Sequence, residues 1–128
     1  EAIEIGKKYI EMHPNSQLAI ETKKQIAYIF KNKGDFANAA KEYQEFLKQY
    51  PESEFAPEAL YQLAKSQIGL NDLQGAEESF QLLLKKYPKS DYSPQAMFEY
   101  GMFSLSKSDI SKADSLLKQV WKFYFPVC

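Results

Sequence analysis

The chain has 128 residues, a length that suits one domain, and its 16 basic and 17 acidic side chains give a net charge of −1. This balance, without any basic block, argues against nucleic acid as the main partner. No run of 18 apolar residues occurs, which excludes a predicted membrane-spanning helix. The single cysteine, Cys128, excludes an intrachain disulfide and a cysteine-based zinc cluster.

Residues 1–14 are predicted to form one helix, and characteristic residues of this segment recur 37 positions later. Ala2 and Pro14 correspond to Ala39 and Pro51. We interpret this helix as the second half of a repeat whose first helix is missing. The chain is therefore expected to be a fragment of a longer protein, and any signal peptide would lie upstream of it.

Residues 15–51 predict two helices joined by the turn Lys31–Asp35. The first is amphipathic and about 15 residues long. The second carries an apolar stripe at Ala39, Tyr43 and Phe46, which stand four, eight and eleven residues after Asp35. Gly, Asn and Ser in the three turns suit helix C-caps, and each turn ends in an Asp that suits the next N-cap.

Residues 52–88 and 89–126 repeat this pattern with a period of 37. Three marks stand in strict register: Asp35, Asp72 and Asp109; Ala27, Ala64 and Gly101; Ala39, Ala76 and Ala113. The small residues predict close crossings between the two helices of each pair. In the joints "HPNS", "YPES" and "YPKS", Ser is predicted to cap the following helix, and Pro57 and Pro94 are predicted in its first turn.

The pattern resembles the tetratricopeptide repeat (TPR), on the residues Ala64, Ala76, Phe80 and Pro88 and their counterparts in the other repeats. The resemblance implies an all-α, TPR-type α-α solenoid, a right-handed superhelix of about seven helices. The period is longer than the usual value of about 34. The tryptophan often found early in the first helix is replaced by Lys23, Leu60 and Met97.

The long period and the "YPxSxxxPxA" joint are similar to TPR proteins of the bacterial envelope. These include the periplasmic partner of the Tol-Pal system and the outer-membrane assembly lipoprotein. A periplasmic or envelope location is implied by this resemblance alone.

No catalytic, metal or cofactor site is predicted, and we expect no enzyme. The only histidine, His13, occupies the joint position held by Tyr50 and Tyr87, which favours a packing role over catalysis. The five glycines are scattered and form no phosphate-binding loop.

Two functions remain from the sequence. One is a protein-interaction scaffold that binds a peptide or partner domain on its concave face. The other is a structural module that positions another domain of a longer protein. More repeats or a lipoprotein signal upstream would favour the scaffold, and a kinase or DNA-binding domain downstream would favour the module.

The TPR resemblance implies that the first helix of each pair lines the concave side. The inward residues on these helices form a predicted partner-binding face: Lys24, Tyr28, Tyr61, Lys65, Phe98 and Met102. This face suits an apolar peptide with an acidic residue. The alternative is that these aromatic residues pack against the next repeat. Tyr28 stands where carboxylate-clamp TPR domains carry their first Asn, which argues against that mode of recognition.

The C-terminal stretch "WKFYFPVC" contains four aromatic residues, Trp121, Phe123, Tyr124 and Phe125. Solenoids need polar caps at their ends, and none is evident here. Either missing neighbouring repeats cover these rings, or the uncapped ends mediate self-association.

Overall fold

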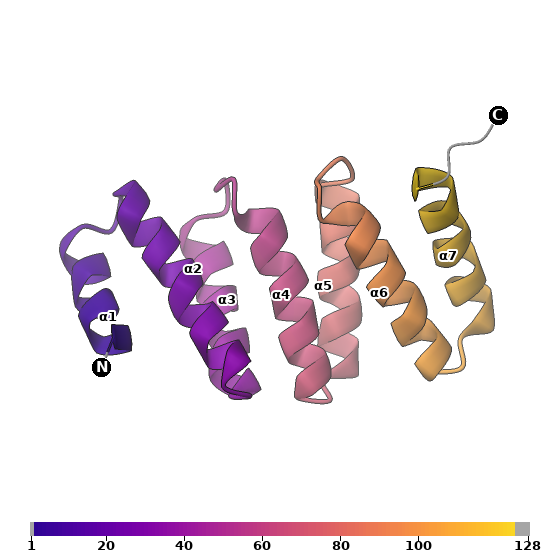
Figure 1. The fold of residues 1–128 in the computed structure, drawn as a ribbon, viewed down its shortest axis with the longest axis horizontal. Coiled ribbons are helices and arrows are strands. Elements are labelled where there is room, and N and C mark those ends of the chain that lie inside the picture. Colours follow the sequence, from indigo (N-terminus) through magenta and orange to yellow (C-terminus); the bar gives the residue numbers. More distant parts are fainter. Residues whose placement is uncertain (1, 125–128) are drawn as a thin grey trace.

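The structure is a computed structural model that describes the backbone of residues 2–124 and the side chains through residue 122. This part of the chain forms helices and no strand (Figure 1). The helices are α1 (Ala2–Met12), α2 (Gln17–Asn32), α3 (Phe36–Gln49), α4 (Ala56–Gly69), α5 (Leu73–Lys86), α6 (Ser93–Ser106) and α7 (Ile110–Tyr124). The all-α fold with seven helices is therefore confirmed.

The helices stand in a row of hairpins, α2–α3, α4–α5 and α6–α7, and α1 packs against α2 (Figure 1). We call α2, α4 and α6 the A helices and the surface they share the A face. In the view of Figure 1 the A helices lie in front of α3 and α5. The two helices α2 and α4 also contact each other directly. Such a contact is expected if the A face is the concave face of the solenoid.

Small residues lie where the two helices of a hairpin cross. Ala27, Ala39, Ala64 and Ala76 have no exposed surface. At Gly101, a Cβ atom would come within 2.9 Å of Leu117 Cδ2 on α7. The predicted close crossings are therefore present, because larger side chains would need space that the packed interior does not have.

The turn inside each hairpin contains one residue in the left-handed backbone region. These residues are Gly34, Asn71 and Ser108, with φ of 81°, 64° and 64° and a spacing of 37. Only glycine adopts this conformation without a steric cost. In each turn the next residue, an aspartate, donates its backbone N–H to a carbonyl in the last turn of the A helix, at 2.8–2.9 Å. This closes the helix end with a Schellman-type bond.

The same aspartates cap the second helix of each hairpin, as the sequence predicts. Their carboxylates accept from the backbone N–H three residues later: Asp35 from Asn38, Asp72 from Gly75 and Asp109 from Lys112. Each bond satisfies a donor that the first helical turn leaves unpaired.

The serine caps predicted at the joints are correct at only one of three positions. Ser16 caps α2 by accepting from the Ala19 N–H at 3.0 Å. Ser53 and Ser90 instead lie before the helix and accept from the backbone N–H two residues on, at 3.0 and 3.1 Å. Pro57 and Pro94 occupy the first helical turn, as predicted. Because proline has no backbone N–H, the first turn of each of these helices has one fewer donor that needs a cap.

The joints are linked to one another by tyrosine hydroxyls. Tyr50 Oη donates to the Pro14 carbonyl at 2.6 Å, and Tyr87 Oη donates to the Pro51 carbonyl at 3.4 Å. Each bond spans 36 residues and joins the closing joint of a repeat to its opening joint.

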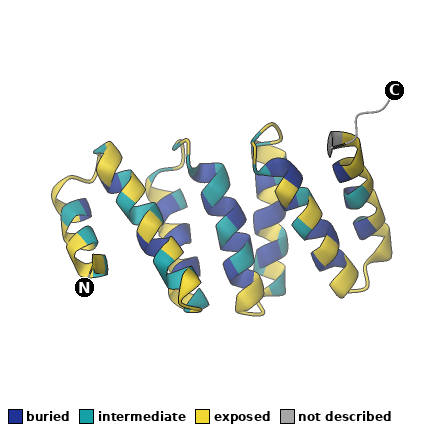
Figure 2. Cartoon of the chain, viewed as in Figure 1, coloured by how far each residue is buried: buried dark blue, intermediate teal, exposed yellow. Residues whose placement is uncertain are grey.

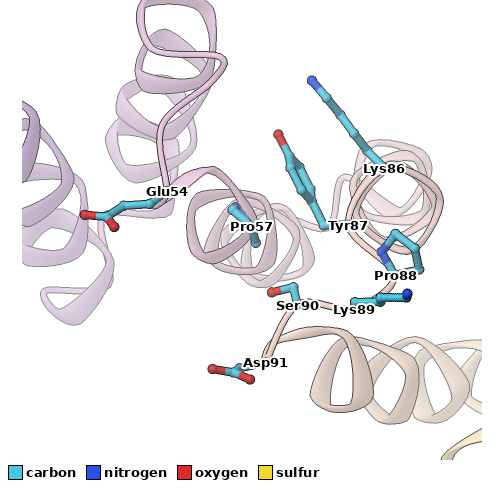
Figure 3. A pocket seen from close by; sticks show the side chains of 8 residues that line it. All are labelled: Glu54, Pro57, Lys86, Tyr87, Pro88, Lys89, Ser90 and Asp91. Carbon is cyan, nitrogen blue, oxygen red and sulfur yellow. The ribbon is translucent and has the colours of Figure 1, made fainter.

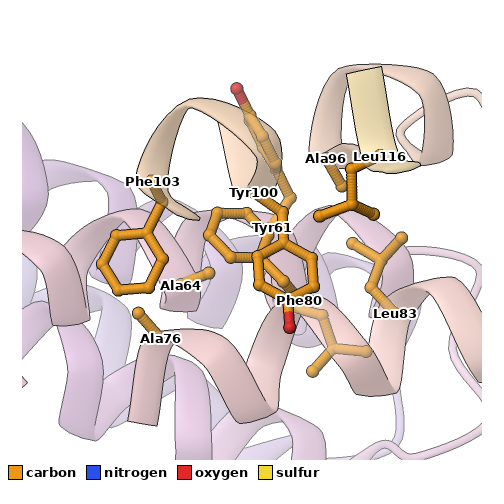
Figure 4. Packing of buried hydrophobic residues seen from close by; sticks show 10 residues of the cluster. Tyr61, Ala64, Ala76, Phe80, Leu83, Ala96, Tyr100, Phe103 and Leu116 are labelled. Atoms are coloured by element: carbon orange, nitrogen blue, oxygen red, sulfur yellow. The ribbon is translucent and has the colours of Figure 1, made fainter. Parts of the chain in front are cut away.

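The hydrophobic core runs along the surfaces where helices meet (Figure 2). Its largest cluster joins α4, α5, α6 and α7 (Figure 4). Phe80 and Tyr100 stack there, with ring centroids 5.5 Å apart and planes 14° apart. Tyr100 lies on α6 and Phe80 on α5, so this stack packs one hairpin against the next.

Acidic residues also link successive repeats. Glu42 on α3 is buried and lies 3.2 Å from Lys7 Nζ of α1 and 3.4 Å from Lys23 Nζ of α2. Glu77 on α5 accepts from Tyr100 Oη at 3.0 Å and pairs with Lys107 and Lys112. The hydrogen bond from Lys112, reinforced by the one from Tyr100, holds the pKa of Glu77 below its ordinary value.

Candidate protein-binding face

One position of the A helices is open in all three repeats. It is occupied by Tyr28, Lys65 and Met102, one residue after the small residue of each hairpin crossing. Tyr28 is 40% exposed and Met102 46% exposed, and the Lys65 side chain is partly exposed. Two of these are apolar or aromatic side chains on an accessible surface. This position is therefore accessible at the surface in each repeat.

The position of Lys24, Tyr61 and Phe98 is different, because the next joint covers it in the first two repeats. Lys24 Nζ lies 4.3 Å from the centroid of the Phe55 ring. The Tyr61 ring lies 5.8 Å from the Tyr92 ring, and Tyr61 is only 3% exposed. Phe98, at the same position in the third repeat, is 46% exposed.

Tyr61 thus packs against the next repeat, the arrangement that the sequence left open as an alternative. Its Oη donates to Glu99 Oε2 on α6 at 3.2 Å, and Lys65 Nζ lies 3.7 Å from the same oxygen. Burial is the main cause that raises the pKa of Tyr61, followed by the charge of Glu99. Removing this ring would disturb the contact between α4 and α6, so Tyr61 cannot be tested as a binding residue alone.

A third position of the A face is also accessible at the surface. It lies three residues after the open position and holds Lys31, Ile68 and Leu105. Ile68 and Leu105 are exposed. Lys31 Nζ lies 5.6 Å from the centroid of the Tyr28 ring. Helical spacing predicts this neighbour on the same face, so the same period would have identified Ile68.

Between α2 and α4, the A face contains a pocket of about 250 Å³. It is lined by Lys24, Gln25, Tyr28, Glu58, Gln62 and Tyr92. Lys24 Nζ and Glu58 Oε1 are 3.2 Å apart across it. Tyr92 reaches it from the joint before α6, which sequence spacing along one helix could not show.

A second cavity, of about 520 Å³, lies at the joint between α5 and α6 (Figure 3). Its lining consists of Glu54 and Pro57 from the preceding joint and helix, and of residues 86–91. The lining contains two lysines and two acidic residues, so neither sign of charge predominates. It is formed by the segments that the sequence predicts to be structural joints.

Comparison with known proteins identifies the repeat. A family model described as "Tetratricopeptide repeat" matches residues 25–53 and 58–90, which cover α3, α5, most of α4 and part of α2. A solved tetratricopeptide repeat protein from Parabacteroides merdae ATCC 43184 superposes with a TM-score of 0.79 over 94% of this chain, at 16% identity. The described part of the chain therefore has the fold of a TPR solenoid.

Two further solved structures resemble this TPR solenoid. MamA superposes with a TM-score of 0.76 at 18% identity, and BtubC (BKLC) from P. vanneervenii with 0.71 at 17% identity, each over 94% of this chain. The chain spans 45% of the length of the Parabacteroides protein, 65% of MamA and 53% of BtubC. At these identities the likeness concerns the fold. A search of curated protein sequences gave no match.

Three further observations concern metal-binding groups, membrane-spanning helices and His13. Within residues 2–124, no group of three or more His, Cys, Asp or Glu side chains could hold a metal ion. In the same part of the chain, no helix combines the length and apolar character needed to cross a bilayer. His13 lies with its ring centroid 5.0 Å from that of Tyr9, inside the joint region.

The C-terminal aromatic residues lie at the edge of what the structure describes. Trp121 is exposed on α7. The side chains of Phe123 and Tyr124, and all of Phe125, fall outside the described part. Self-association through the ends therefore stays a prediction, which light scattering at high protein concentration tests directly.

Proposed function

We propose that this TPR solenoid is a non-enzymatic protein-interaction module that binds a peptide segment of a partner along the A face. One observation carries the proposal: the A helices expose side chains at the same two positions in successive repeats. Tyr28, Lys65 and Met102 occupy one position, and Ile68 and Leu105 the other. The opposite side of the same helices is buried in the hairpins.

The chemistry of these side chains favours an apolar peptide that carries an acidic residue. Tyr28, Ile68, Met102 and Leu105 supply apolar contacts, and such anchors dominate affinity at protein interfaces. Lys31 lies over an aromatic ring and forms no ion pair among the described residues. Lys65 is 3.7 Å from a carboxylate that also accepts from Tyr61. Both cations can therefore approach an acidic side chain of the partner.

The test is a selection of random peptides on the immobilised protein, followed by affinity measurements. The A-face variant combines Lys65→Ala with Met102→Ala, which removes two accessible side chains without placing a second negative charge beside Glu99. A matched control, Leu82→Ala with Lys85→Ala, changes an exposed apolar residue and a lysine on α5. We expect selected peptides to lose at least about tenfold in affinity for the A-face variant, equivalent to about 1.4 kcal/mol. Equal binding to both variants would place the partner elsewhere.

The proposed location is the bacterial envelope. It rests on the 37-residue period and the "YPxS" joints, which resemble those of envelope TPR proteins. Fractionation of the native host, with an antibody against this chain, tests the location. Recovery of the protein in the cytoplasmic fraction alone would contradict it.

A further inference from the structure

A groove of about 290 Å³ opens between α3 and α5, and we call it the α3–α5 groove. Leu60 and Leu63 of α4 lie at its base and are nearly buried, while Leu47 lines it from α3 and Leu82 from α5. In the view of Figure 1, α3 and α5 lie behind the A helices. The groove therefore faces away from the A face. Its lining is mainly apolar, and Leu82 is 48% exposed.

The equivalent place between α1 and α3 is bridged by ion pairs. Glu42 on α3 stands 37 residues before Ser79 of the groove, and Lys23 on α2 stands 37 residues before Leu60. Glu42 Oε2 lies 3.2 Å from Lys7 Nζ of α1, and Glu42 Oε1 lies 3.4 Å from Lys23 Nζ. Charged side chains of the protein itself therefore occupy the surface between α1 and α3.

The equivalent place between α5 and α7 is filled by a tyrosine. Tyr100 stands 37 residues after Leu63 and stacks on Phe80 (Figure 4). Its Oη accepts from Gln81 Nε2 at 2.8 Å, and Lys112 Nζ lies 5.6 Å from the centroid of its ring. A large ring and its polar neighbours thus take up the space that the α3–α5 groove leaves open.

Small side chains keep the α3–α5 groove open. Two of its lining positions hold smaller residues than the equivalent positions in the neighbouring repeats: Gly75 against Asn38 and Lys112, and Ser79 against Glu42 and Leu116. A Cβ atom at Gly75 would come within 2.7 Å of Gln67 Nε2, which belongs to the same lining. The groove is therefore a property of this one repeat interface and does not follow from the repeat pattern.

Glu78 gives the groove its charge. It is the charged residue of the lining, it is exposed on α5, and it forms no ion pair with any described residue. Glu42 and Glu77, by contrast, each pair with two lysines. An unpaired carboxylate beside an apolar groove is complementary to a partner that carries a cation next to an apolar side chain.

We propose that the α3–α5 groove is a second protein-binding site, which takes a leucine or methionine side chain flanked by Lys or Arg in a partner protein. The aliphatic side chain contacts Leu63 and Leu82, and the basic residue pairs with Glu78. The volume lies below the range of roughly 300–1,000 Å³ typical for drug-sized ligands, which suits a single side chain. This site goes beyond the proposed function and does not depend on it, because it lies on the other face.

Four blocked tripeptides test the groove by NMR titration of the folded protein. They are N-acetylated, C-amidated peptides with the sequences Arg-Leu-Arg, Arg-Met-Arg, Arg-Ala-Arg and Glu-Leu-Glu. We expect the first two to shift the methyl signals of Leu63 and Leu82. Arg-Ala-Arg should bind about tenfold more weakly than Arg-Leu-Arg, because most of the apolar contact is lost. Glu-Leu-Glu should bind about threefold more weakly, the effect of a partly exposed ion pair.

Two exposed positions of α5 separate the apolar contact from the charge. Leu82→Gln introduces the residue type that α7 carries at the equivalent position, Gln119, and should weaken Arg-Leu-Arg by about fivefold. Glu78→Lys introduces the residue type of Lys41 and should make Glu-Leu-Glu bind more tightly than Arg-Leu-Arg. Glu52→Lys, the same charge change at an exposed joint position, is the matched control. Thermal unfolding of each variant should remain close to that of the wild type, because these side chains are exposed.

The variants of the A-face experiment provide a second control. Lys65→Ala with Met102→Ala should leave tripeptide binding unchanged, whereas Leu82→Ala with Lys85→Ala should weaken it. Peptides selected for the A face should show the opposite pattern. Failure of one site is therefore distinguishable from failure of the other.

Three results would overturn the inference. The absence of any shift of the Leu63 and Leu82 methyl signals with all four tripeptides would show that the groove admits no anchor. Equal binding of Arg-Ala-Arg and Arg-Leu-Arg would reduce the site to charge attraction at Glu78. Light scattering that shows a wild-type dimer and a monomeric Leu82→Gln variant would show that a second copy of the chain covers the groove.

Discussion

The two sides of the A helices follow different rules. On the hairpin side, Ala27, Ala64 and Gly101 are all small, because the partner helix leaves no room for more. Three residues earlier, on the A face, the same helices carry Lys24, Tyr61 and Phe98. One side repeats its chemistry and the other varies it. The difference separates the positions that hold each hairpin together from the positions whose side chains vary between repeats.

The comparison between Tyr61 and Phe98 refines this rule. Both occupy the same position, yet Tyr61 is 3% exposed and Phe98 46%. The aromatic residue of the following joint, Tyr92, explains the difference, since it covers Tyr61. Exposure on the A face therefore depends on the next repeat as well as on the helix itself.

The largest expected effect comes from enlarging the repeated side. Ala64→Leu should lower the free energy of unfolding by about 1–3 kcal/mol, because the hairpin crossing has no space for the added atoms. Ala37→Leu, at an exposed position of α3, is the control and should have little effect. Urea unfolding measures both. An unchanged midpoint for Ala64→Leu would remove the distinction between the two sides.

The joints provide a second test of equivalent positions. Tyr50→Phe removes the 2.6 Å bond to Pro14 and should cost about 1 kcal/mol. Tyr87→Phe removes a bond of 3.4 Å, which is near the limit for a hydrogen bond, and should cost less. Thermal unfolding of the two single variants gives the order. A larger cost for Tyr87→Phe would contradict the geometry.

The Glu77 cluster predicts a dependence on pH. The pKa of Glu77 is lowered in the folded state, so its contribution to stability is present above the unfolded value of about 4.3 and is lost as the pH falls below it. Glu77→Gln should lower stability at pH 7 by less than about 1 kcal/mol, because the ion pairs are partly exposed.

The same variant has a second signature. The difference between wild type and Glu77→Gln should shrink as unfolding is repeated at lower pH, since Glu77 itself becomes neutral there. A difference that stays constant with pH would show that Glu77 acts by packing alone.

The smallest effect is expected in the hairpin turns. Ser108 adopts φ of 64°, where a side chain is strained, whereas Gly34 occupies the equivalent position without strain. Ser108→Gly should raise stability by about 0.5 kcal/mol, and Asn71→Gly by less because Asn tolerates this conformation better. Differential scanning calorimetry resolves the order. Destabilisation by Ser108→Gly would mean that the serine side chain contributes a contact that outweighs the strain.

Most of the scaffold could be predicted from the sequence because its positions repeat. The small residues, the aspartate caps and the prolines each recur every 37 residues, and a recurring residue reports a recurring contact. The serine caps at Ser53 and Ser90 were wrong, because the prolines shift the helix start away from the serines. The capping propensity of serine alone does not predict this shift of the helix start.

The A face was harder to predict, because its side chains meet residues from another repeat. Tyr61 is buried by Tyr92, and the pocket between α2 and α4 includes Tyr92 from a joint 30 residues after Gln62. Helical spacing identifies which side of a helix a residue occupies. It does not identify what the following repeat places over it.

The tyrosine bonds between joints also bear on how a partner would be measured. Because Tyr50 donates to Pro14 and Tyr87 donates to Pro51, the start and end of the first two 37-residue units are linked by hydrogen bonds. Successive repeats then cannot lengthen or shorten independently, and equivalent side chains on neighbouring A helices keep a constant interval. The row of A helices thus presents equivalent side chains at regular intervals. A flexible peptide bound along this row would contact equivalent side chains at intervals set by the joints. The spacing between its anchor residues would then matter as much as their identity.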